Sequence, residues 1–219
     1  MLIAIDGTAS SGKGTVARLL AAFLGLTHID SGKVYRAVAL SAHKAGVRPD
    51  ESARLVSILK RLDLQLLDDP NLSGRLAGQL AAQYSPNKGF RSEVTKRLRE
   101  VAQSNGNVVM DGRDIGTEVL PFADVKIFVD GDPRVRAARR ARELARTGIS
   151  VTTEDMFKDI TERDNRDRMR SISPMKPAVD AMILDTTDLD VEGTFREALR
   201  LIEEKLGFGE GSRVRSTVP

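Results

Sequence analysis

The chain has 219 residues, of which 41% are hydrophobic and 30% charged, so it is long enough to bury a core and short enough to form one domain. The absence of cysteine excludes disulfides and thiolate metal sites, and two histidines argue against a histidine-rich metal site. A formal net charge of +3 is too small by itself to indicate nucleic-acid binding, and the lack of a signal-peptide pattern or a long apolar run predicts a cytoplasmic protein.

Short apolar runs alternate with longer stretches of helical period, which is typical of an α/β protein with a mainly parallel sheet. Apolar residues recur every three or four positions between Gly14 and Gly25, and again over residues 191–202, so both stretches predict helices. Ligands bind beyond the carboxyl ends of parallel strands, where Asp and Gly residues stand in this sequence. The predicted strands are Leu2–Ile5, Thr27–Asp30, Asn107–Asp111, Val125–Asp130 and Ala181–Asp185.

Two long regions interrupt this alternation. Residues 33–103 are irregular and partly helical, contain the turn sequences DDPNLSG and YSPNKGF, and are predicted to be an insertion between two strands. Residues 134–170 are polar and rich in arginine, and we expect them to move above a site. Residues 1–206 are expected to form the single domain, and residues 207–219, which lack periodicity, are predicted to be a disordered tail.

The first loop carries the clearest motif. GTASSGKGT matches the pattern GxxxxGK, follows a predicted strand and begins a predicted helix, which is the context of a phosphate-binding loop. Convergent backbone N–H groups, a helix N-terminus and Lys13 suit the loop to a polyphosphate. Gly14 stands where a serine or threonine usually contacts magnesium, so we expect Mg²⁺ to be held through water or by a carboxylate, with Asp111 as the candidate. The residues expected to contact ATP phosphates are Gly7, Thr8, Ala9, Ser10, Ser11, Gly12, Lys13, Gly14 and Thr15.

Two further motifs follow the second and third strands. DSGKVYR places Ser31 and Arg36 after the second strand, and DGRDIGT places Arg113 and Asp114 after the third. Guanidinium groups neutralise phosphate oxygens bidentately, so the two arginines indicate an anionic acceptor. The alternative for each arginine is a surface ion pair.

A charged stretch near residue 165, ERDNRDRMR, places Arg163, Asp167 and Arg170 along one helical face. On the pattern alone, a solvent-exposed helix with salt bridges is the favoured reading of this stretch.

Together, GTASSGKGT, DSGKVYR, DGRDIGT, ERDNRDRMR and AMILDTT, in this order, resemble the bacterial cytidylate kinases of the nucleoside monophosphate kinase group. The similarity runs from Leu2 to about Leu206. It implies ATP-dependent phosphorylation of CMP and dCMP with Mg²⁺, and a P-loop fold with a five-stranded parallel sheet, an acceptor-binding insertion and a short lid. Neither nucleic acid nor a membrane is expected as a partner. The protein is expected to be a monomer.

The resemblance also implies roles for single residues. Arg36 and Arg113 would hold the acceptor phosphate with Ser31 nearby, and Asp114 and Arg91 would face the cytosine. The residues implied for the acceptor sugar and the transferring phosphate are Arg163, Asp167 and Arg170; those implied for the lid are Arg136, Arg139 and Arg140, with Arg139 expected at ATP.

These roles have a chemical basis. A carboxylate such as Asp114 accepts a hydrogen bond from the exocyclic amine of cytosine and repels the carbonyl of uracil, which predicts a preference for CMP over UMP of roughly tenfold to several hundredfold. A nucleoside monophosphate is mostly dianionic at pH 7, so the nucleophile needs no general base. Mg²⁺, Lys13 and the lid arginines are expected to compensate charge during in-line transfer. The residues expected to be catalytic are Lys13, Arg36, Arg113, Arg163 and Arg170.

Three alternatives stay open at this point. Another small P-loop kinase, acting on UMP or shikimate, would share the first loop and ignore CMP. A basic protein gripping nucleic acid with residues 134–146 would bind duplexes without ATP in a salt-dependent manner. A regulator that binds ATP without transferring phosphate would show no acceptor-dependent turnover.

Overall fold

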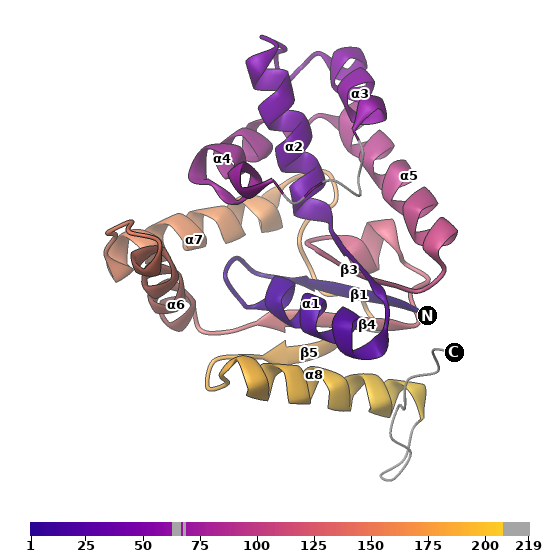
Figure 1. Ribbon diagram of the computed structural model, residues 1–219, viewed down its shortest axis with the longest axis vertical. Helices are drawn as coiled ribbons and strands as arrows, with labels where there is room; N and C mark the ends of the chain where they lie inside the picture. Colours follow the sequence, from indigo (N-terminus) through magenta and orange to yellow (C-terminus); the bar gives the residue numbers. More distant parts are fainter. Residues whose placement is uncertain (63–66, 68, 208–219) are drawn as a thin grey trace. The chain divides into compact units, whose positions relative to one another are not determined.

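The structure is a computed structural model that describes residues 1–62, 67 and 69–207 (Figure 1). The chain divides into two compact units. The first unit joins residues 1–29 to the chain from residue 105 onward and contains the sheet. The second unit comprises residues 30–104 and is helical.

The sheet of the first unit has five strands in the order β2-β3-β1-β4-β5. The central strand β1 pairs in parallel with β3 on one side and β4 on the other, and β4 pairs in parallel with β5. This arrangement confirms the predicted five-stranded parallel sheet, and β1 continues two residues beyond the predicted end at Ile5. The strands are β1 (Leu2–Gly7), β2 (Thr27–Asp30), β3 (Val108–Gly112), β4 (Val125–Asp130) and β5 (Met182–Asp185).

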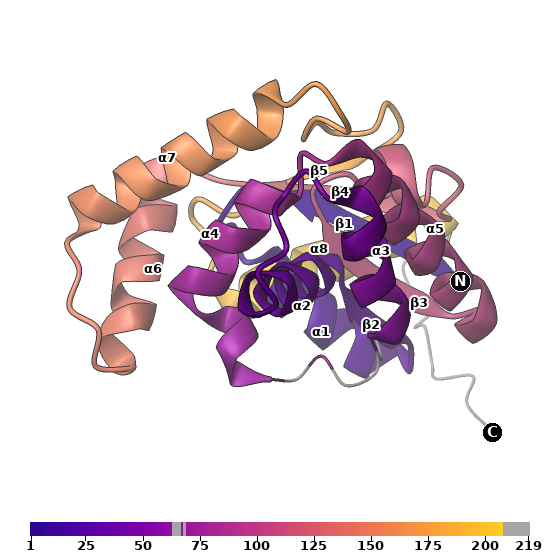
Figure 2. The same cartoon turned by 90° about the horizontal axis from the view of Figure 1, so that it is seen from above.

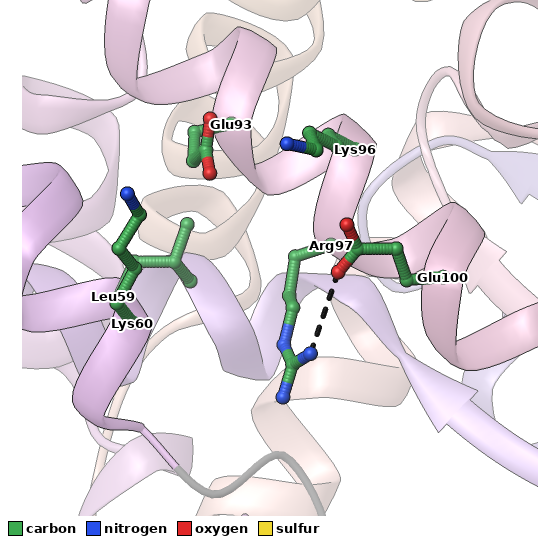
Figure 3. A pocket seen from close by; sticks show the side chains of 6 residues that line it. All are labelled: Leu59, Lys60, Glu93, Lys96, Arg97 and Glu100. Carbon is green, nitrogen blue, oxygen red and sulfur yellow. Dashed lines mark hydrogen bonds and ion pairs between the residues drawn. The ribbon is translucent and has the colours of Figure 1, made fainter.

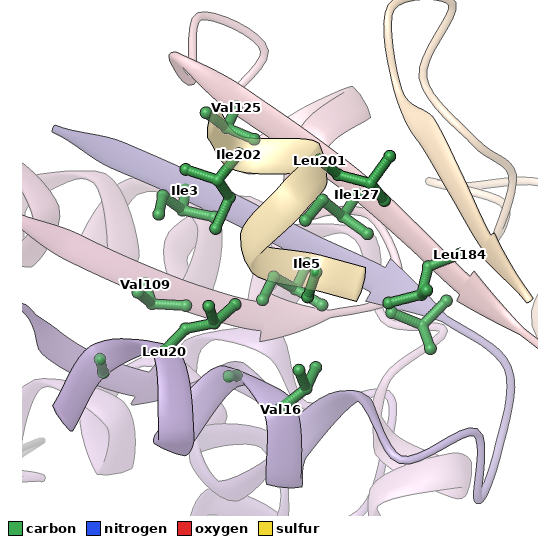
Figure 4. Packing of buried hydrophobic residues seen from close by; sticks show 14 residues of the cluster. Ile3, Ile5, Val16, Leu20, Val109, Val125, Ile127, Leu184, Leu201 and Ile202 are labelled. Atoms are coloured by element: carbon green, nitrogen blue, oxygen red, sulfur yellow. The ribbon is translucent and has the colours of Figure 1, made fainter. Parts of the chain in front are cut away.

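One face of the sheet is covered by α1 (Lys13–Leu24) and α8 (Val191–Leu206), whose apolar sides pack on alternate strand residues (Figure 4). Ile3 and Ile5 point to the same face because side chains alternate along a strand. Both helices were predicted from their periodicity, and α1 ends as expected, with Gly25 in the left-handed conformation. The packing of α1 against the sheet therefore fixes the position of the loop between β1 and α1.

The other face of the sheet is covered within this unit by the segment after β3, which includes η3 (Ile115–Val119), a single π-helical turn. Asp6, near the end of β1, holds the start of this turn. Its two carboxylate oxygens accept hydrogen bonds from the N–H groups of Ile115 and Gly116, both at 2.7 Å. Asp6 thereby ties the end of β1 to the loop that begins at the end of β3.

Two helices, α6 (Pro133–Arg146) and α7 (Thr153–Met169), follow β4 and lie side by side (Figures 1 and 2). They occupy most of the region predicted as a lid, residues 134–170, and its movement stays a prediction. Asp132 caps the first helix and Thr152 caps the second, since the side chain of each accepts hydrogen bonds from backbone N–H groups of the first turn. Apolar residues join the two helices to Ala9 of the first loop.

The second unit has nearly the bounds predicted for the insertion, and its acceptor-binding role stays a prediction. YSPNKGF separates the last two helices, as its turn residues predict, and DDPNLSG contains a short 3₁₀ helix. The helices are α2 (Ser31–Lys44), α3 (Ser52–Arg61), η2 (Pro70–Ser73), α4 (Arg75–Tyr84) and α5 (Lys88–Asn105). The buried Tyr84 hydroxyl donates to the carbonyl oxygen of Val47 at 2.6 Å. This hydrogen bond connects the end of α4 to the loop that follows α2.

The predicted tail, residues 207–219, lies outside the described residues apart from Gly207, which caps α8 in the left-handed conformation. Among the residues that the structure describes, none of the helices combines the length and apolar character needed to cross a bilayer.

Candidate active site

The first loop, Gly7–Thr15, connects β1 to α1 with a backbone that only certain residues allow. Gly7 has φ +154°, and a Cβ there would lie 2.0 Å from the carbonyl oxygen of Val129. Ser10 and Gly12 also have positive φ, so the chain reverses over a few residues. Thr8, Ala9 and Ser11 are buried, and both the N–H and the carbonyl oxygen of Ala9 make hydrogen bonds within the protein.

The start of α1 is suited to an anion. Gly12 is its N-cap and makes no side-chain cap, so no side-chain oxygen competes with a phosphate for the first-turn N–H groups. Lys13 is the first residue of the helix, and its Nζ donates to the carbonyl oxygen of Thr8 at 3.1 Å. The loop thus brings a cation and a helix N-terminus together, as the motif predicts.

Behind the loop lies a buried ion pair between α6 and α7. Arg136 Nη1 is 2.7 Å from Asp164 Oδ2, and each side chain is 2% exposed. The other oxygen of Asp164 accepts from the N–H of Ala9 at 2.8 Å, while Arg136 Nη1 donates to the carbonyl oxygen of Ala9 at 2.7 Å. Arg136 was expected in the lid region, and its guanidinium is buried against the phosphate loop.

Asp111, the candidate Mg²⁺ ligand, is the next-to-last residue of β3. Its Oδ1 is 2.7 Å from His28 Nε2, and its Oδ2 is 3.5 Å from the position of a Cβ at Gly14. Mg²⁺ is usually bound by one or two carboxylates together with substrate phosphates and water, so a single carboxylate at the start of α1 fits this ion. In the described part of the chain, no three His, Cys, Asp or Glu side chains cluster as a metal site.

The residues after β3 are joined to the end of α7. Arg113 Nε donates to Asp167 Oδ2 at 3.1 Å, and Arg170 Nη2 lies 3.5 Å from Asp114 Oδ1. Asp114 is buried, and the other three side chains are largely buried. Arg163, in contrast, is exposed.

Asp167 and Arg170 make these contacts whereas Arg163 is exposed, so the roles implied for the three residues of ERDNRDRMR stay predictions. Burial acts to raise the pKa of Asp167, but the positive charges of Arg113, Arg163 and Arg170 outweigh it, so the pKa lies below its ordinary value. Asp167 and Arg170 therefore belong to a cluster at the end of β3, and a fully solvated helix face is not what the structure has.

In the second unit, Ser31 is buried at the start of α2, and Arg36 lies one turn further along the same helix. Arg36 Nη1 donates to the carbonyl oxygen of Leu72 at 3.4 Å and lies 4.0 Å from Asp30 Oδ2. Arg91 is buried, donates from Nε to the carbonyl oxygen of Ser85 at 3.2 Å, and lies over the ring of Tyr35. The structure thus fixes each of these side chains, and their contacts with an acceptor stay predictions.

Of the arginines on α6, Arg136 and Arg139 make internal contacts, whereas Arg134, Arg142 and Arg146 are exposed. Besides Arg136, Arg139 donates to the carbonyl oxygens of Thr186 at 2.5 Å and Leu189 at 2.9 Å. Arg140 pairs with Glu143 at 2.8 Å. The expected contact of Arg139 with ATP stays a prediction.

Sequence reasoning missed three polar groups of this region, Asp6, His28 and Asp164, and it did not predict the burial of Arg136. Asp6 is deeply buried, and burial raises the pKa of its carboxyl to about 7, although the N–H donors of Gly116 and Ile115 lower it and the charge of Asp114 raises it. Arg136 and Asp164 stand among other charged residues in the sequence, so nothing in the pattern marks them as buried. The position of Asp6, directly after the apolar run Leu2–Ile5 and before Gly7, was the available signal.

A separate depression lies in the second unit between α3 and α5 (Figure 3). Its volume is about 260 Å³, and Arg97 and Glu100 form an ion pair of 3.4 Å within it. It contains none of the predicted site residues. Its lining consists of Leu59, Lys60, Glu93, Lys96, Arg97 and Glu100.

Comparisons with known proteins show the family of the chain. A family model described as cytidylate kinase matches residues 3–204. Proteins named cytidylate kinase from Rhodopseudomonas palustris (strain BisB5) and Afipia carboxidovorans are each 42% identical to the chain; the alignments cover 93% of it and 96% and 98% of the two relatives. A solved structure of an uncharacterized protein from Eubacterium ventriosum is similar in fold alone, with a TM-score of 0.53 and 13% identity over 93% of this chain and 98% of that one. The chain therefore belongs to the cytidylate kinase family.

Proposed function

We propose that the protein transfers the γ-phosphoryl group of ATP to CMP and dCMP, giving ADP with CDP or dCDP. Family membership supports this reaction class. The observation that carries the proposal is the pair of contacts Arg113–Asp167 and Asp114–Arg170, which hold a guanidinium and a carboxylate at the end of β3 in the unit that contains the phosphate loop.

The donor would bind at the loop Gly7–Thr15. The N–H groups of the loop and the first turn of α1 stabilise phosphate oxygens, and Lys13 adds a full positive charge. Lys13 contacts the carbonyl oxygen of Thr8, so a phosphate would exchange one oxygen partner for another at Nζ. Asp111 would hold Mg²⁺, which when bound neutralises charge on the phosphates.

The acceptor would be read by the residues after β3. Asp167 fixes the orientation of Arg113 through its Nε, which restricts the directions in which the planar guanidinium can meet a phosphate. Asp114 presents a buried carboxylate whose position is fixed on one side by Arg170. A carboxylate accepts from the amine of cytosine and is repelled by the carbonyl of uracil, so Asp114 supplies the base preference. Ser31, Arg36 and Arg91 are the further residues proposed for the acceptor.

The chemistry requires positioning and charge compensation rather than a base. The acceptor phosphate is already a dianion at pH 7, with a second pKa of about 6. Lys13 and Arg113 would bind oxygens of the two nucleotides, and Arg163 and Arg170 on α7 would add positive charge to the transferring group. ATP contact by Arg139, a monomeric state and a cytoplasmic location stay predictions from the sequence.

The test is an acceptor panel. The protein, Mg²⁺ and ATP are incubated with CMP, dCMP, UMP, AMP or shikimate, and ADP release is followed in a coupled assay. CMP and dCMP should be phosphorylated, with kcat/KM for UMP lower by roughly tenfold or more. Equal kcat/KM for CMP and UMP would remove Asp114 from base recognition, and turnover with shikimate alone would overturn the proposed acceptor class.

A further inference from the structure

The buried pair Arg136–Asp164 binds both hydrogen-bonding groups of one residue in the phosphate loop. Asp164 Oδ1 accepts from the Ala9 N–H at 2.8 Å, and Arg136 Nη1 donates to the Ala9 carbonyl oxygen at 2.7 Å. Arg136 Nε also donates to the carbonyl oxygen of Gly131 at 2.8 Å, at the entry to α6. Ala9 directly precedes Ser10, whose positive φ makes the sharpest departure from ordinary backbone in the loop.

Burying such an ion pair has a desolvation cost in free energy. Both side chains are 2% exposed, and removing two charges from water is unfavourable unless they are paired and their remaining hydrogen-bonding groups are satisfied. A well-packed apolar pair often stabilises a fold equally well. The ion pair is therefore poorly explained by stability alone, whereas its geometry defines the position of Ala9 relative to two helices.

The helix that carries Asp164 continues to the acceptor residues. Asp167 follows three residues later and binds Arg113, and Arg170 follows three residues after that and lies beside Asp114. Residues three apart lie on neighbouring positions of one helix side. A displacement of α7 along its axis would thus move Ala9 and the loop at Arg113 together, because each is held by a short polar contact to the same helix.

We propose that Arg136 and Asp164 are positioning residues that latch the phosphate loop to α7 and thereby couple donor binding to acceptor binding. The inference rests on the proposed function, because it assigns the two coupled ligands as ATP and CMP. CMP binding at Arg113 and Asp114 fixes α7, and α7 fixes Ala9 in the conformation that receives phosphates. By reciprocity, a donor bound to the loop increases the affinity for CMP by the same factor.

If the ion pair were only structural, its loss would have a different effect. It would lower the unfolding midpoint and reduce the affinities for ATP and for CMP, but the effect of one ligand on the affinity for the other would not change. If the pair is a latch, its loss should abolish the effect of CMP on the affinity for the donor. The decisive quantity is therefore the ratio of the donor Kd measured without CMP to the donor Kd measured with saturating CMP.

This ratio is measured by calorimetry with the non-transferable β,γ-imido analogue of ATP in the presence of Mg²⁺. For the unmodified protein we expect a ratio of roughly five or more. In Asp164→Asn an amide N–H₂ faces the Arg136 guanidinium, and in Arg136→Lys one ammonium cannot reach all three oxygen acceptors, so both variants should give a ratio near 1. Glu162→Gln and Arg142→Ala, which change exposed charges on the same two helices, are matched controls and should keep the ratio of the unmodified protein.

Hydrogen exchange in the unmodified protein gives the same test without a variant that alters the buried pair. Saturating CMP alone should slow exchange severalfold in peptides that cover residues 7–12. Unchanged exchange in this segment, or an unaltered ratio in folded Asp164→Asn, would overturn the latch. Failure of the proposed function is distinguishable, because the unmodified protein would then bind no CMP or form no CDP, whereas failure of the latch alone leaves CDP formation intact.

Discussion

Replacing Gly7 by alanine tests whether the phosphate loop must lie where the structure has it. A Cβ at this position would be 2.0 Å from the carbonyl oxygen of Val129, and distances under 3.0 Å do not persist, so the end of β1 must move by about 1 Å relative to β4. The Thr8 N–H donates to the same carbonyl oxygen at 3.2 Å and would lose this acceptor. Backbone strain of about 1–3 kcal/mol and one lost hydrogen bond of about 1 kcal/mol together predict a loss of roughly 2–4 kcal/mol in the free energy of unfolding.

The same displacement has a larger effect on activity. A misplacement of about 1 Å in the groups that orient a reacting phosphate costs on the order of a hundredfold, so kcat/KM for ATP at saturating CMP should fall by about that factor in Gly7→Ala. The assays are coupled ADP release and urea denaturation. Gly78→Ala in α4 is the control, because a Cβ there meets nothing within 4 Å; it should leave activity unchanged and stability equal or slightly higher. A Gly7→Ala protein with kcat/KM within threefold of the unmodified value and an unchanged urea midpoint would refute the reasoning.

Three further predictions follow from other side chains. Lys13→Met should lower kcat at least a hundredfold while the thermal midpoint stays within a few degrees, and unchanged kcat would mean that the loop does not bind the transferred phosphate. Asp114→Asn exchanges an acceptor for a group that also donates, so the ratio of kcat/KM for CMP to that for UMP should fall at least tenfold; an unchanged ratio would place base recognition elsewhere. Asp6 has a folded-state pKa of about 7 against an ordinary value of 3.8, so its ionised form is disfavoured in the fold and its contribution to stability falls as pH rises from about 4 to about 7. This contribution is at most about 4 kcal/mol. The free energy of unfolding of Asp6→Asn, followed by urea denaturation, should lack that part of the pH dependence, and a pH profile identical to that of the unmodified protein would contradict it.

Much of the first unit could be predicted because its signals are local. Alternating apolar runs and helical periods determined the strands and the two helices on the sheet, and the spacing of glycines before Lys13 determined the loop between them. The residues after β3 were found for a related reason, since the end of a parallel strand is where a charged side chain reaches a ligand.

Partners across the fold could not be predicted in the same way. The sequence places Asp164 three residues before Asp167, yet one contacts Ala9 and the other Arg113, and nothing local distinguishes their partners. Arg136 stands in a run of arginines whose composition indicates a solvated surface, and its burial is decided by α7 packing against it. Asp6 received no role for the same reason, because its hydrogen bonds are made to residues more than a hundred positions away.

The central claim is that one protein brings a donor phosphate and a cytidine monophosphate together for direct transfer. Incubation with Mg²⁺, CMP and ATP labelled at the γ-phosphorus, followed by separation of the nucleotides, tests it most directly. The label should appear in CDP, with one labelled phosphate for each ADP formed. Label released as inorganic phosphate, or retained in ATP while CMP stays unchanged, would contradict it.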